Sequence, residues 1–202
     1  MKKEDKTELS RQRILSAAMD EFGARGYAGA SLNSICAAGI AKGLLYHNFE
    51  GKDALYLACV EESFSGLTKA LRAAEIGADF KKYTEVRLHF FTENERQARV
   101  FFDALLQPPE PLKERIAELR REFDLLNAEL CRGILGTVRL RQEVSESDAM
   151  DYFAMLQTMF NGYFSSPACR ALSFEEKMSA HEEKLGRLLD LMLYGIADKG
   201  DK

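Results

Sequence analysis

Apolar residues recur every three or four positions along most of this sequence, and this period most constrains the fold. Between residues 52 and 75 they are Leu57, Val60, Phe64, Leu67 and Leu71. This spacing places them on one face of an α-helix. Helix-forming residues are abundant, only four prolines occur, and runs of β-branched residues are few. The sequence therefore predicts an all-α chain.

Glycines and prolines mark where one helix ends and the next begins. Gly26 and Gly39 can adopt the left-handed conformation that closes a helix, and Ser31 can cap the helix between them. In the run Pro108-Pro109-Glu110-Pro111 the three prolines lack backbone N–H donors, and the run interrupts the helical pattern. We predict helices over residues 10–26, 31–39, 40–48, 52–75, 79–95, 98–107, 111–139, 146–164 and 173–197.

Charge is distributed unevenly along the chain. Residues 1–55 carry eight Lys and Arg against seven Asp and Glu, whereas the whole chain has a net charge of -4. The asymmetry is compatible with a small DNA-facing head on an acidic body. We predict the domain boundary inside the long fourth helix, with domains of residues 1–52 and 53–202.

Neither a targeting segment nor a redox framework is indicated. The first residues, MKKEDKTELSRQR, contain lysines but no apolar segment, and no apolar run reaches the roughly 18 residues of a membrane span. We therefore expect a cytoplasmic protein without a membrane partner. The cysteines, at positions 36, 59, 131 and 169, form no CxxC pair, which favours free thiols over a zinc site or disulfides.

Catalytic motifs are also lacking in the sequence. No GxSxG, phosphate-binding loop or GxGxxG occurs, and the glutamates after His181 are not followed by the second histidine of a zinc helix. Glu85, His89 and Glu93 share one helical face at metal-ligand spacing, but such a stripe is usually a solvated surface. We predict a protein that is not an enzyme and uses neither a cofactor nor a metal.

A different kind of site is indicated by GIAKGLLYHNFEGKDALY, residues 39–56, where basic, amide and aromatic side chains lie beside glycines. Two short helices joined at Gly39 are typical of a helix-turn-helix, whose second helix lies in the major groove of DNA. Basic and hydroxyl side chains at the groove edges bind phosphate, and amide or imidazole groups can reach base edges.

Residues 10–57 resemble the TetR (AcrR-like) family of transcriptional regulators. The similarity combines the spacing of Phe22, Gly26 and Tyr27, the glycine at position 39, the string Lys-Gly-x-Leu-Tyr-x-x-Phe from Lys42, and a further lysine after it. It implies an N-terminal three-helix helix-turn-helix head and a larger helical body for ligand binding and dimerisation. The DNA contacts implied by the resemblance are Ser31, Lys42, Gly43, Leu44, Tyr46, His47, Asn48 and Lys52.

Some of these residues also have structural interpretations. Tyr46 can pack on the core of the head, Asn48 can cap a helix end, and Lys52 can lie on a solvated face. The segment also departs from the family pattern at two places. Ala41 replaces the Ser or Thr that usually caps the recognition helix, and the segment from Ile35 to the following glycine is one residue shorter. A deletion inside a helix rotates the residues after it by about 100°, so the turn must absorb it or the recognition helix is misaimed.

The final two predicted helices carry apolar stripes suited to pairing between protomers. The last helix repeats apolar residues at spacings of three and four, in a heptad seam, and residues 146–164 are apolar on more than one side. The alternative is that both stripes are core within one chain. We predict a homodimer with an interface of Tyr152, Leu156, Phe160, Met178, His181, Leu185, Leu188 and Met192.

The aromatic residues of the body can enclose an apolar pocket, as the resemblance implies, or can form solid core. Arg87, His89 and Glu93 are nearby polar residues that can orient a ligand or simply be exposed or paired. The residues predicted to line a pocket are Phe64, Tyr83, Phe90, Phe101, Phe102, Leu105, Phe123, Met155 and Met159.

These observations favour a sequence-specific DNA-binding transcriptional regulator. The resemblance implies a repressor that a small-molecule inducer releases from its double-stranded DNA operator. The alternative is a helical dimeric adaptor or sensor that has lost DNA binding, which the shortened second helix makes plausible.

Overall fold

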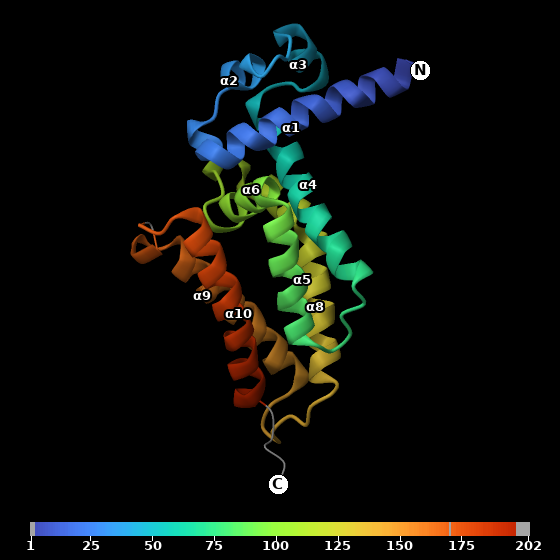
Figure 1. Cartoon of the computed structure of the whole chain (residues 1–202). Helices are drawn as coiled ribbons and strands as arrows, with labels where there is room; N and C mark the ends of the chain where they lie inside the picture. The colour runs from blue at the N-terminus through green and yellow to red at the C-terminus, as the bar shows by residue number, and fades with distance from the viewer. Residues whose placement is uncertain (1–2, 170, 197–202) are drawn as a thin grey trace. The chain divides into compact units, whose positions relative to one another are not determined.

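The structure is a computed structural model that describes residues 3–169 and 171–196. Within these residues it is all helical apart from turns and loops, so the predicted fold class is confirmed. The helices are α1 Lys3–Gly29, α2 Leu32–Ala37, α3 Lys42–Asn48, α4 Lys52–Ala73, α5 Phe80–Glu93, α6 Glu95–Leu106, α7 Lys113–Leu119, α8 Arg121–Leu135, α9 Glu146–Ser165 and α10 Phe174–Ile196, with short 3-10 turns at Glu110–Leu112 and Pro167–Cys169 (Figure 1).

The chain divides into two compact units. The first contains residues up to Ser65 together with Asn94–Arg120, and the second contains Gly66–Glu93 and the residues from Arg121 onward. Helix α4 therefore contributes its first part to one unit and its last part to the other. The functional boundary near residue 52 remains a prediction.

The core of the first unit forms where α1 packs against α2, α3 and α6. On α1, Ile14, Ala18 and Phe22 are fully buried, as their four-residue spacing predicts. Phe22 packs edge-on against Tyr56 of α4, with ring centroids 5.0 Å apart. This core holds α2 and α3, which follow Gly26 in the chain, against α1.

Gly26 interrupts α1 in a conformation that essentially only glycine adopts. Its φ is 63° and its ψ is 176°. A Cβ at this position would lie 3.3 Å from Oδ1 of Asp103 on α6. The other oxygen of this carboxylate accepts hydrogen bonds from the hydroxyl of Tyr56 at 2.7 Å and from the backbone N–H of Tyr27 at 3.4 Å. Asp103 thus joins α6 to α1 and α4 within the first unit.

In the second unit, α10 packs against α5 and α9, and α8 also packs against α9. Helix α9 begins with a capping box, in which Ser145 and Asp148 each bind the other's backbone N–H. None of the helices that the structure describes is long and apolar enough to cross a membrane.

Several predicted helix boundaries are wrong. Helix α1 begins at Lys3 rather than near Ser10, and the predicted helix over residues 111–139 is two helices that meet at Arg120. The second of these ends at Leu135, where a turn follows in which the backbone N–H of Thr137 donates to the carbonyl of Ile134 at 2.9 Å. No glycine or proline marks the break at Arg120. The predicted end of the last helix, residue 197, lies outside the described residues.

Candidate nucleic-acid interface

Ser31 holds the start of α2. Its hydroxyl oxygen accepts a hydrogen bond from the backbone N–H of Ser34 at 3.0 Å, so the predicted cap is present. The backbone N–H of Ser31 donates to Glu21 of α1 at 3.1 Å. These bonds fix α2 on α1, while Ile35 buries its side chain in the core.

The turn between α2 and α3 is built around Gly39. Gly39 adopts a φ of 85°, and the backbone N–H groups of Gly39 and Ile40 both donate to the carbonyl of Cys36 at 3.1 Å. Ile40 is buried directly after the turn. Helix α3 then begins at Lys42 with Ala41 as an N-cap that offers no side-chain hydrogen bond.

Helix α3 has one buried and one exposed side. Leu45 is completely buried, and Phe49 is buried where the helix ends. Lys42, Tyr46 and His47 are exposed. Tyr46 does not pack into the core, because about half of its surface, 49%, is accessible. The helix therefore presents a cation, a phenol and an imidazole on its outer side.

Gly43 lies among these exposed side chains. A Cβ added to Gly43 would meet no atom within 4 Å. Packing within this chain therefore gives no reason for a glycine here. Close approach of another molecule does give one, because the missing side chain lets a partner come near the helix backbone.

The three remaining residues predicted for α3 and its flank are half-buried. The side-chain amide of Asn48 donates to the backbone carbonyl of Leu44 at 2.8 Å, so it caps the helix as the structural interpretation expected. The ammonium of Lys52 lies 4.6 Å from the ring centroid of Tyr27, whose hydroxyl donates to Asp53 at 2.7 Å. DNA contacts by these three residues, as by Ser31, Lys42, Gly43, Tyr46 and His47, remain predictions.

Residues predicted to line a ligand pocket are scattered. Phe64, Phe101 and Phe102 are buried in the first unit, where the first two rings lie 4.5 Å apart. Tyr83 and Phe123 are buried in the second unit. Phe90 and Leu105 are half-buried, and Met155 and Met159 are exposed. We find dense aromatic packing around several of these residues, and pocket lining remains a prediction for all nine.

An open pocket of about 300 Å³ lies elsewhere in the second unit. Its walls come from the start of α5, the end of α8 and one side of α10, and include Phe80, Thr84, Ile134, Gly186 and Leu193. None of the predicted pocket residues lines it.

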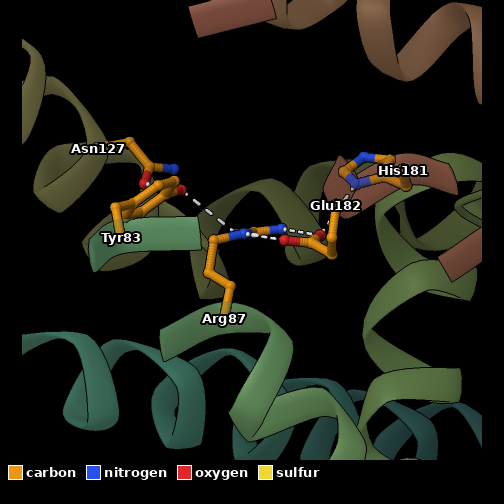
Figure 2. Close-up of polar contacts among 5 residues, drawn as sticks. All are labelled: Tyr83, Arg87, Asn127, His181 and Glu182. Atoms are coloured by element: carbon orange, nitrogen blue, oxygen red, sulfur yellow. Dashed lines mark hydrogen bonds and ion pairs between the residues drawn. The ribbon is translucent and has the colours of Figure 1, made fainter. Parts of the chain in front are cut away.

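A buried polar cluster joins α5, α8 and α10 in the second unit (Figure 2). Arg87 forms a bidentate ion pair with Glu182, with nitrogen–oxygen distances of 2.8 and 2.7 Å. Both side chains are only 2% exposed. Arg87 also donates to the hydroxyl of Tyr83, which donates to Asn127 at 2.8 Å, and His181 lies 3.0 Å from Glu182. Arg87 is therefore paired, as one interpretation of the sequence expected.

The predicted interface on α10 is largely buried within the chain. His181, Leu185 and Met192 are buried, and Met178 and Leu188 are half-buried. On α9, Leu156 and Phe160 are half-buried and Tyr152 is exposed. The α10 stripe therefore contributes to the core of its own chain, and its part in a dimer remains a prediction.

An exposed apolar surface on α9 and α10 includes Tyr152 of the predicted interface and Met155 and Met159 of the predicted pocket lining. We call it the α9–α10 apolar face, defined by Tyr152, Met155, Met159 and Tyr163 of α9 and Leu191 and Tyr194 of α10. These side chains are between 42% and 72% exposed. Exposed apolar surfaces that gather large residues commonly mark interaction sites.

The candidate metal ligands on α5 do not assemble into a site. Glu85, His89 and Glu93 are all exposed. Among the residues that the structure describes, no group of three His, Cys, Asp or Glu side chains is placed to hold a metal ion. The described cysteines are free thiols, three of them buried.

Comparisons with known proteins agree with this geometry. Residues 14–59 match the family model described as bacterial regulatory proteins, tetR family. This match assigns the helix-turn-helix segment to the TetR family and confirms the resemblance seen in the sequence. No curated protein matches the chain significantly.

Solved structures extend the similarity to the whole fold. A putative TetR-family regulator from Shewanella sp. PV-4 has a TM-score of 0.60 at 20% identity, covering 94% of this chain and 99% of that one. The fatty acid degradation regulator FadR from Bacillus halodurans has a TM-score of 0.62 at 19% identity, covering 89% and 94%. A regulator from Chloroflexus aurantiacus has a TM-score of 0.59 at 22% identity, covering 95% of each chain. The chain therefore has the fold of TetR-family regulators.

The buried ion pair makes stability sensitive to acid. Burial alone raises the pKa of Glu182, but the charge of Arg87 and the hydrogen bonds from His181 and Arg87 outweigh it and lower the pKa to about 2. The contribution of Glu182 is complete above the ordinary pKa of a glutamate and is lost as pH falls from there toward about 2. Burial also lowers the pKa of His181, so protonation of this imidazole in acid likewise destabilises the folded state.

We predict that Glu182→Gln lowers the free energy of unfolding at pH 7 by about 3–5 kcal/mol, because it leaves Arg87 buried without its counter-charge. Urea titrations at pH 7 and pH 3 measure this difference, which shrinks at pH 3. The double variant Arg87→Met with Glu182→Leu serves as control and recovers most of the loss, because it removes both charges. An equal loss in Glu182→Gln at both pH values would contradict the assignment.

Proposed function

We propose that this protein is a sequence-specific DNA-binding transcriptional regulator that acts in the cytoplasm as a homodimer. The observation that carries the proposal is the two-sided character of α3. Leu45 anchors the helix in the core, whereas Lys42, Tyr46 and His47 are exposed around a glycine that internal packing does not require. The major groove of DNA admits a helix of this kind.

The side chains on α3 divide into two roles. Lys42 neutralises a phosphate, and the hydroxyl of Tyr46 donates to another, which positions the helix. His47 offers a ring nitrogen to a base edge, and Gly43 permits close approach. Ser31 and Lys52 bind phosphate at the flanks, after Lys52 swings away from the ring of Tyr27. Leu44 contacts a thymine methyl group. Asn48 caps the end of α3 through its side-chain amide and also hydrogen-bonds the DNA backbone.

A homodimer supplies the second recognition helix. One short helix reads too few base pairs for specificity, whereas a two-fold pair reads half-sites about 34–36 Å apart. The α9–α10 apolar face supports this part of the proposal, because it exposes large aromatic and methionine side chains to solvent. Burying such a face against a second copy removes apolar surface from water.

We further propose that the protein is a repressor released from its operator by a small-molecule inducer. Helix α4 supports this mechanism, because it starts beside α3 and ends in the second unit. An inducer that binds one arrangement of the body more tightly than the other shifts the population of DNA-binding heads. A coupling of about 1–3 kcal/mol would change operator affinity roughly 5- to 150-fold.

The alternative is a dimeric helical adaptor or sensor that does not bind DNA. The shortened segment between Ile35 and Gly39 favours it if the altered turn misdirects α3. Binding to duplex DNA separates the two functions, since the affinity of a phosphate-binding protein falls steeply as salt rises.

We predict that the purified protein enriches fragments from its own promoter region at low salt. On the bound duplex, Lys42→Ala weakens affinity and reduces the slope of log affinity against log salt by about 1 per lost phosphate contact. Tyr46→Phe weakens affinity by the roughly 1.5–3 kcal/mol of a hydrogen bond to a charged group. The control is Lys81→Ala, which removes an equal charge from α5. If the wild-type protein retains no duplex even at low salt, the adaptor function replaces this proposal.

We predict that Met159→Glu converts the dimer to a monomer, because it places a charge at the most exposed position, 72%, of the α9–α10 apolar face. Light scattering during size-exclusion chromatography at micromolar concentration gives the mass. Leu88→Glu, on α5 with 44% exposure, is the matched control and leaves the mass unchanged. A wild-type protein with the mass of a single chain would contradict the dimer.

A further inference from the structure

Arg11 of α1 reaches the end of the candidate recognition helix. Its guanidinium carbon lies 4.6 Å from the ring centroid of Phe49, the residue that caps the C-terminus of α3. Phe49 is 5% exposed and donates its backbone N–H to the carbonyl of Leu45 at 2.9 Å. Both residues belong to the first unit, so the position of Arg11 relative to α3 is fixed within that unit.

Arg11 has no acidic partner among the described residues, whereas several other arginines of the first unit do. Arg25, Arg96, Arg99 and Arg115 each pair with a carboxylate. The side chain of Arg11 is half-buried, and among the described residues its guanidinium lies against the face of an aromatic ring. A partly desolvated cation of this kind favours an anion supplied from outside the chain.

The contact of Arg11 with the Phe49 ring is not a hydrogen bond, so it does not occupy the N–H donors of the guanidinium. A guanidinium that lies over a ring uses its flat face for the contact, while its N–H groups point outward in the plane of the group. This planar arrangement matches two oxygens of one phosphate. The ring of Phe49 also limits the freedom of the side chain, which reduces the entropy lost on binding.

We propose that Arg11 is a further DNA-binding residue, which holds a backbone phosphate beside the C-terminal end of α3. This inference rests on the proposed function and extends the DNA-binding surface from α2, α3 and the start of α4 to α1. A phosphate contact carries no base information, so Arg11 contributes affinity and orientation equally on all sequences.

The experiment uses a duplex that the wild-type protein selects from a random pool, and measures affinity by fluorescence anisotropy between 50 and 200 mM salt, a range over which phosphate contacts change binding by about 10³ to 10⁵. Arg11→Met keeps an unbranched apolar stem against Phe49 and removes the charge. Arg115→Met removes an equal charge from α7 in the same unit and is the control.

The expected result for Arg11→Met is a salt slope smaller by about 0.9 for each lost phosphate contact, or roughly 2 for a dimer. The loss of affinity is the same on selected and unrelated duplexes. Arg115→Met leaves the slope unchanged. Arg11→Lys retains the slope with weaker affinity, because it keeps the charge but loses the stacked planar group.

An unchanged slope in Arg11→Met would overturn the inference. This includes the case in which affinity falls together with the melting temperature, since Arg11 would then only support the fold. A wild-type protein that selects no duplex would instead overturn the proposed function, and the inference with it. If the wild type selects a duplex but Arg11→Met leaves the salt slope unchanged, the inference about Arg11 is rejected and the proposed function is not.

Discussion

The candidate interface depends on how the apolar side of α3 is anchored. Ile40, Leu45 and Phe49 are buried at the start, middle and end of this short segment, against a core to which α1 contributes. A seven-residue helix has little stability of its own, so this burial fixes both its existence and its rotation about its axis. The opposite side must then face solvent, which is why Lys42, Tyr46 and His47 are exposed together.

Polar contacts supply the remaining order within each unit. In the first, the carboxylate of Asp103 accepts from Tyr27 and Tyr56, and burial raises its pKa. These two hydrogen bonds link α6 to α1 and to the first part of α4, which belong to the same compact unit as α3. In the second, the bidentate pair of Arg87 and Glu182 ties α5 to α10. Removing either charge is costly in such a buried site, so these contacts favour one arrangement of the helices over alternatives.

Local signals in the sequence were sufficient to predict most of the helices and the residues on the exposed side of α3. The glycines at positions 26 and 39, the cap at Ser31 and the three- and four-residue spacing act through neighbouring backbone, so they are readable without tertiary structure. The pairing of Arg87 with Glu182 joins residues 95 positions apart, and Asp103 lies 47 and 76 positions from its two partners. Periodicity also cannot tell whether a stripe such as that on α10 faces its own chain or a second copy, because both environments require the same apolar residues.

The most direct test is a hydroxyl-radical footprint of the wild-type protein on a duplex that it selects. Two recognition helices related by two-fold symmetry protect two backbone segments on one side of the duplex, with centres about 10–10.5 base pairs apart or a multiple of this spacing. That pattern is the predicted result. A single protected segment, or a duplex cleaved evenly in the presence of saturating protein, would contradict the account.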